Sequence, residues 1–139
     1  MRVLSFILLS CLAVSWADEI SPTEMKKNES PKALREFFGE AGVGVEKGPT
    51  QGVILDGVEY EKIWRELGLT EEPAAVDFAK EVVVLSTTRG SRITFRLRDE
   101  GEERLQVMSI STKDIRSGLR FAFCVLSRSA WKQINDRKL

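Results

Sequence analysis

The spacing of apolar residues along the chain predicts one helix in its middle. Four apolar residues recur at intervals of three and four, which places them on one face of a helix. They are Tyr60, Ile63, Trp64 and Leu67. Asp56 stands at the expected N-cap, Glu59 completes the pattern of a capping box, and Gly68 is the expected C-terminal stop. This aromatic stripe predicts a helix face that packs into a core.

After Val76 the apolar period changes to two, which predicts strands. Residues 53–55 form a short candidate strand. Residues 81–87 and 119–126 are apolar on both faces, so each is expected to be a strand buried on both sides. Residues 92–98 instead alternate apolar and polar positions. The apolar set is Ile93, Phe95 and Leu97.

Residues 99–102 carry the turn chemistry of a hairpin, and a return strand follows them. Its inward positions start at Leu105 and Val107 and then shift to Met108 and Ile110. This change of phase predicts a β-bulge near Val107–Met108. Toward the end of the chain we expect a short turn or helical piece at Trp131 and an edge segment at Ile134.

The first fifty residues differ from the rest of the chain. Residues 1–17 have a basic start, an apolar stretch and small residues before Ala17-Asp18, which predicts a signal peptide cleaved there and a secreted or periplasmic protein. A lipoprotein box ending at Cys11 is the alternative. Residues 18–50 are expected to be a polar leader with one short helix. Its cap is Ser30-Pro31, its apolar positions are Leu34, Phe37 and Phe38, and its stop is Gly39.

Together these patterns predict the α+β class. We expect a single small domain at residues 51–139, with a mainly antiparallel sheet of four to five strands in a meander and one principal helix packed on a face. The chain of 139 residues is long enough for one such domain. No segment is long enough to predict a membrane span.

The chain contains no histidine, and this excludes several catalytic mechanisms. Serine and cysteine hydrolases that use a histidine base are ruled out, and so are most catalytic zinc sites. No phosphate-binding loop or dinucleotide fingerprint is present. Cys124 lies between apolar residues and is expected to be a buried thiol. We therefore predict a protein that is not an enzyme and that has neither cofactor nor metal.

The charges are distributed unevenly between the two halves of the chain. Residues 18–85 hold eight basic and fifteen acidic residues, whereas residues 86–139 hold twelve and six. Arg92, Arg96 and Arg98 share the outward face of one predicted strand, and Arg89 and Arg104 are expected to join them. Such a row suits carboxylates, phosphates or an acidic protein surface. The alternative is a solvated face that the acidic half neutralises.

Carboxylates gather in the loop at Glu71-Glu72 and in the hairpin turn at residues 99–103. A hydrolase that works with carboxylates alone would need two of them facing each other across a cleft. Such a hydrolase is the least favoured hypothesis. Nucleic acid is not an expected partner because the overall charge is balanced and the chain is expected to be exported.

One part of the chain resembles a group of small secreted bacterial proteins. The resemblance runs over residues 51–136 and rests on the tryptophan helix, on Val76-Asp77-Phe78 with the strand after it, and on the tail at residues 111–136. The group is distantly similar to the C-terminal domain of PrcB-like protease-complex accessory proteins, which bind a partner protease. Those proteins carry a glycine-glycine-tyrosine turn where this chain has residues 87–92.

The leading hypothesis is therefore an exported, non-enzymatic binding module for another protein, with a secreted protease as the implied partner. A cell-envelope binder of an anionic ligand or polysaccharide is the alternative. Both hypotheses use the same five arginines, namely Arg89, Arg92, Arg96, Arg98 and Arg104. The sequence does not specify the oligomeric state.

Overall fold

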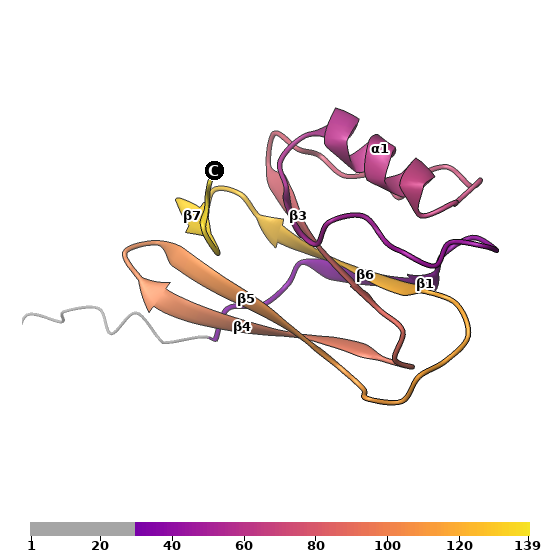
Figure 1. Cartoon of the computed structure of the whole chain (residues 1–139). Helices are drawn as coiled ribbons and strands as arrows, with labels where there is room; N and C mark the ends of the chain where they lie inside the picture. Colours follow the sequence, from indigo (N-terminus) through magenta and orange to yellow (C-terminus); the bar gives the residue numbers. More distant parts are fainter. Residues whose placement is uncertain (1–29) are drawn as a thin grey trace, which may run out of the picture.

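The computed structural model describes residues 30–139 and folds them into three layers. Helix α1 (Gly57–Glu66) forms one outer layer, a four-stranded sheet forms the middle, and a second four-stranded sheet forms the other outer layer (Figure 1). The strands are β1 (Arg35–Glu40), β2 (Gly52–Ile54), β3 (Glu81–Thr88), β4 (Ile93–Gly101), β5 (Arg104–Ser111), β6 (Arg120–Ser127), β7 (Gln133–Ile134) and β8 (Arg137–Lys138). The predicted signal peptide, its cleavage site, Cys11 and residues 18–29 of the predicted leader lie outside the described residues.

The α+β class and the single principal helix are confirmed, but the prediction of one meandering sheet is wrong. The middle sheet has the order β1-β6-β3-β2 and is antiparallel throughout. The outer sheet has the order β4-β5-β7-β8, and only its β5–β7 pair is parallel. Strands β3 and β4 follow each other in sequence but do not pair; β3 pairs instead with β6 along its whole length and with β2 over Val83–Leu85. The β4–β5 hairpin therefore packs across the sheet.

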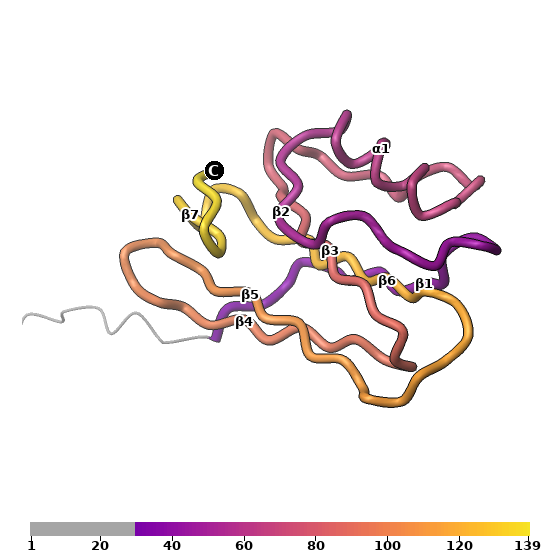
Figure 2. The backbone as a smooth tube through the Cα atoms, viewed as in Figure 1, coloured from indigo at the N-terminus to yellow at the C-terminus, as the bar shows by residue number. Residues whose placement is uncertain are grey.

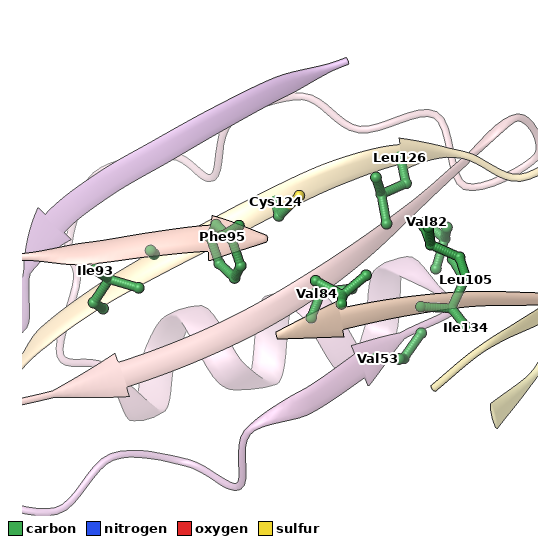
Figure 3. Close-up of a cluster of buried hydrophobic side chains, with 11 residues drawn as sticks. Val53, Val82, Val84, Ile93, Phe95, Leu105, Cys124, Leu126 and Ile134 are labelled. Atoms are coloured by element: carbon green, nitrogen blue, oxygen red, sulfur yellow. The ribbon is translucent and has the colours of Figure 1, made fainter. Parts of the chain in front are cut away.

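Two hydrophobic cores lie on the two sides of the middle sheet. The core between the sheets is built from Val53, Val82, Val84, Ile93, Phe95, Leu105, Val107, Ala122, Cys124, Leu126 and Ile134, and most of it is drawn in Figure 3. The core under the helix is built from Ile54, Tyr60, Ile63, Leu67, Val83, Leu85, Leu119, Phe121, Phe123 and Val125. Alternate residues of β3 and β6 enter opposite cores, as strand geometry requires. The prediction that both strands are buried on both faces is confirmed.

Helix α1 begins and ends where the sequence predicts. The Asp56 side chain caps it by accepting a hydrogen bond from the Glu59 backbone N–H at 2.8 Å. The Glu59 carboxylate does not complete the predicted capping box, because it instead forms an ion pair with Arg137 at 3.2 Å and so joins the helix to β8. Gly68 follows the helix with a φ of 69°, a conformation that favours glycine. The aromatic stripe packs into the core, with Tyr60 edge-on to Phe123.

The predicted short helix at residues 30–39 is wrong, because these residues include strand β1. Strand β1 pairs with β6 from Arg35 opposite Val125 to Glu40 opposite Arg120. Its side chains alternate between half-buried and exposed, and Phe37 packs into the core under the helix. The pairing with β6 satisfies backbone hydrogen bonds along one whole edge, which outweighs a weak local helical preference.

The predicted β-bulge at Val107–Met108 is also wrong. The β4–β5 pairing runs unbroken past both residues, and the register shifts between Asp99 and Gly101 at the hairpin turn. Gly101 has a φ of 80° there. The second half of β5 does not change phase, so Met108 and Ile110 lie on the exposed face of the hairpin. Near the C-terminus, Trp131 precedes β7, and Ile134 is buried in the core between the sheets.

Cys124 is a buried thiol, as predicted, and it lies in the core between the sheets. Burial raises the pKa of this thiol to about 12, and the nearby Glu36 adds to the increase. Because the thiolate is the reactive form of cysteine, Cys124 is a packing residue.

Arg35 and Glu81 form a bidentate ion pair across the middle sheet. Both guanidinium-to-carboxylate distances are 2.7 Å. The same carboxylate accepts a hydrogen bond from the Asp77 N–H at 3.0 Å, and Arg35 also donates to the Ala75 carbonyl at 2.9 Å. The hydrogen bond from Arg35 is the main cause that lowers the pKa of Glu81. The pair fixes the loop after α1 against β1.

The contribution of the core under the helix to stability can be tested with one buried and one exposed phenylalanine. Phe123→Ala is expected to lower the free energy of unfolding by about 3–5 kcal/mol, because the side chain is fully buried and its loss leaves a cavity. Phe38→Ala, in the neighbouring strand, is expected to cost less than about 1 kcal/mol because Phe38 is 58% exposed. Urea denaturation monitored by circular dichroism measures both values. Equal losses would contradict the layered arrangement.

The Arg35–Glu81 pair predicts a pH-dependent contribution to stability. Because folding lowers the pKa of Glu81, its contribution is present above the unfolded-state pKa, near 4.5, and is lost as the pH falls through the lower folded value. Glu81→Gln is therefore expected to destabilise the protein at pH 7 and to have a smaller effect near pH 3. Urea midpoints at both pH values test this. Glu61→Gln, at an exposed helix position, is the control and is expected to have little effect at either pH.

Candidate functional site

The outer face of the β4–β5 hairpin carries four of the five predicted arginines. Ile93, Phe95 and Val107 enter the core between the sheets, so the alternate positions of both strands face away from it. Those outward positions hold Arg92 just before β4, Arg96 and Arg98 in β4, and Arg104 in β5. All four are exposed. We call this set the arginine face.

Arg89 does not belong to the arginine face. It lies in the turn after β3, where its guanidinium donates to the Glu46 carbonyl at 3.4 Å. With Arg116 it lines an open cavity of about 520 Å³ beside the loop at residues 40–46. The prediction that all five arginines act together is therefore not supported by this geometry.

Most of the arginine face lacks an acidic partner. Within residues 30–139, no carboxylate lies within 4 Å of Arg92, Arg96 or Arg98 in an ion pair, whereas Arg104 pairs with Glu102 at 3.6 Å. Among the described residues, the acidic half of the chain therefore supplies no ion-pair partner for these three guanidinium groups. They remain available for an external anion or carboxylate.

Two exposed apolar side chains lie among these arginines, although the sequence pattern predicts them to lie in the core. Met108 is directly opposite Arg96 across the strand pair, and Ile110 is opposite Thr94. They are 44% and 54% exposed. A strict alternation counted from Leu105 would have found them, because it assigns every even-numbered position of β5 to the outer face.

The base of the hairpin is fixed by a set of short polar contacts. The Arg92 N–H donates to the Thr112 hydroxyl at 3.2 Å, and the Thr112 N–H donates to the Arg92 carbonyl at 3.1 Å. Asp114 accepts from both the N–H and the hydroxyl of Ser91 at 3.1 Å. Hydrogen bonds from Thr112, Ser91 and Arg116 hold the pKa of Asp114 well below its usual range. Figure 2 shows the segment after β5 passing beside the β3–β4 turn.

Three of the four carboxylates at residues 99–103 have structural partners. Asp99 accepts from the Gly101 N–H at 2.8 Å, Glu102 pairs with Arg104, and Glu103 pairs with Lys132. A general acid in a hydrolase needs a raised pKa, whereas those of Glu81 and Asp114 are lowered. Residues 30–139 contain no group of three or more potential metal ligands. These contacts give a carboxylate-only hydrolase no support.

No protein-family model matches the chain, and no curated protein or solved structure was found to be similar to it. The resemblance to PrcB-like accessory proteins therefore stays a prediction. Of the helices in residues 30–139, none has the length and apolar character needed to cross a membrane.

The position of the hairpin depends on close packing at Gly90. A Cβ atom there would lie 2.2 Å from the Thr112 carbonyl oxygen, which is closer than atoms can approach. Gly90→Ala is therefore expected to lower the free energy of unfolding by about 1–3 kcal/mol. Gly57→Ala is the control, because the nearest atom to its new Cβ is 3.8 Å away. Urea denaturation of both variants tests the expectation, and equal midpoints for Gly90→Ala and the parent would contradict it.

Proposed function

We propose that this chain is an exported, non-enzymatic binding module and that the arginine face contacts a partner protein. The proposed partner presents an acidic surface, and a secreted protease is the candidate that follows from the sequence resemblance. Export rests on the predicted signal peptide. The contact surface rests on the geometry of the hairpin.

The observation that carries the proposal is the combination of unpaired arginines and exposed apolar side chains on one face. Arg92, Arg96 and Arg98 have no acidic partner in the described part of the chain, and Met108 and Ile110 lie among them. Arginine and methionine are enriched at protein interfaces, where a guanidinium forms directed bonds to carboxylates. The sheet behind this surface is anchored in a core, so the backbone is already in place for binding.

The shape of the face favours a protein over a small anionic ligand. Small molecules bind in concave sites that bury most of their surface. Arg92 lines an open cavity of about 330 Å³ with Phe38, whereas Arg96 and Arg98 project from the strand and line neither this cavity nor the one beside the loop at residues 40–46. An exposed face that carries both guanidinium groups and apolar side chains suits another folded surface. An anionic polysaccharide is the alternative ligand for the same arginines.

Replacing the three unpaired arginines with glutamate is expected to abolish partner capture. The purified chain and its Arg92→Glu/Arg96→Glu/Arg98→Glu variant serve as baits for the secreted fraction of the source organism, and captured proteins are quantified by mass spectrometry. A protein that depends on this face should be captured at least about 10-fold less by the variant, because one interface arginine can contribute about 2 kcal/mol. Capture should also weaken as salt is added.

The control is Arg65→Glu, which changes the charge of an exposed arginine on helix α1 in the opposite layer. It is expected to capture the partner as the parent does. Undiminished capture by the triple variant would reject the arginine face as the contact surface. A rise in the thermal midpoint with anionic glycans, absent from the triple variant, would favour the polysaccharide alternative.

A further inference from the structure

A second candidate surface lies at the middle sheet, where a groove follows the edge of β1. Its volume is about 380 Å³. The residues that line it are Phe37, Phe38, Gly39, Glu40, Trp64, Gly68, Leu69, Thr70, Glu71, Ala74 and Phe121. Residues 37–40 are consecutive in one strand, so their side chains alternate between its two faces. They can all line one groove only if the groove runs along the backbone edge of the strand.

The backbone edge of β1 is free on the groove side. Strand β1 is the outermost strand of the middle sheet, and β6 is its only partner among the described residues. The other side of an outermost strand presents unpaired N–H and C=O groups. A second extended chain can pair with such groups, which is how several peptide-binding domains recognise an added strand.

The walls of the groove are held in place before any ligand binds. The Trp64 indole N–H donates to the Glu71 carbonyl at 2.8 Å, and the indole stacks on Phe123 with ring centres 5.9 Å apart. Arg35 joins β1 to the Ala75 carbonyl and to Glu81. These contacts fix the loop after α1 at a set distance from β1. A peptide would therefore not need to order this loop, which lowers the entropic cost of binding.

The groove is lined by aromatic and acidic side chains. Its floor is aromatic, and the only charged side chains that line it are two glutamates. Glu40 is paired with Arg120 at 2.7 Å, whereas Glu71 has no ion-pair partner within residues 30–139. Phe38 is 58% exposed at the rim. An apolar side chain fits the aromatic floor, and a lysine or arginine fits beside Glu71.

We propose that β1 binds an extended segment of a partner protein by strand addition, and that this segment combines apolar residues with lysine or arginine. The inference goes beyond the arginine face, from which this groove differs in preferring a basic partner; the two surfaces adjoin where Arg92 and Phe38 line one open cavity of about 330 Å³. A second copy of this chain is a poorer occupant. It would bring another acidic groove against the first, and like charges repel.

The probe is a fluorescent seven-residue peptide that alternates lysine with valine or phenylalanine. Binding to the mature chain is measured by fluorescence anisotropy, and backbone NMR shifts locate the site. Saturable binding with shifts centred on β1 is expected. A peptide with glutamate in place of lysine should bind more weakly by at least ~5-fold. Methylation of alternate peptide N–H groups should weaken the lysine peptide by ~5-fold or more, because each lost hydrogen bond contributes about 1 kcal/mol.

Substitutions in the chain separate this inference from the proposed function. Glu71→Lys is expected to weaken the lysine peptide up to about 5-fold, as for an exposed ion pair. Glu72→Lys is the matched control, because the neighbouring side chain does not line the groove. An Arg96→Glu/Arg98→Glu variant, which keeps Arg92 beside Phe38, should bind the peptide as the parent does. Equal binding of the methylated peptide, shifts away from β1, or a dimer with β1 amides protected from exchange would overturn the proposal.

Discussion

Strand β6 imposes the constraint on which the rest of the structure depends. Six consecutive residues, Phe121 to Leu126, are buried, so the strand is apolar on both faces and needs cover on both. Helix α1 covers one face and the β4–β5 hairpin covers the other. Its backbone also needs a partner on each edge, and β1 and β3 supply them. The three layers follow because β6 needs apolar cover on both faces and a hydrogen-bonding partner on both edges.

Each element that covers β6 has a second side that nothing in the described part of the chain covers. With β1 used to cover one edge of β6, the opposite edge of β1 becomes the outside of the sheet. With the hairpin used as a cover, its second face becomes the outside of the domain, and the arginines lie there. Both candidate surfaces therefore belong to elements that contact β6 on one side: one surface is the free edge of β1, and the other is the outer face of the hairpin. Because side chains alternate along a strand, neighbouring residues can face the core and the surface in turn.

The elements that were predicted correctly are those whose defining residues lie close together along the chain. Helix α1 has a cap, an apolar stripe and a glycine stop within thirteen residues of sequence, and all three lie where expected. Strand β6 was predicted from a short apolar run that follows Gly118 and contains two phenylalanines, features that favour a doubly buried strand. The positions of Arg96 and Arg98 on one face also followed from simple alternation, which needs no knowledge of the partner strand.

The errors share one physical cause, which is that pairing is decided by residues far apart in sequence. Leu34, Phe37 and Phe38 have helical spacing, but β6 offers this segment hydrogen bonds along one whole edge. Phe38, Met108 and Ile110 are apolar and exposed, so they obscured the alternation that would have revealed the correct faces. Apolar residues do occur on protein surfaces, and an exposed group of them carries more information than a single one. The two-sheet arrangement depended on which strands pair, and no local pattern encodes that choice.

The two surfaces differ in what they require of a partner. The arginine face consists of long, exposed side chains that lose rotamer freedom on binding, so its selectivity depends on well-placed carboxylates in the partner. The β1 groove offers a fixed backbone edge and an aromatic floor, so it can accept many sequences that share an extended shape. Binding to the first surface should weaken strongly with salt, because its contacts are exposed charges. Binding to the second should be much less sensitive, because backbone hydrogen bonds and apolar burial supply most of the affinity.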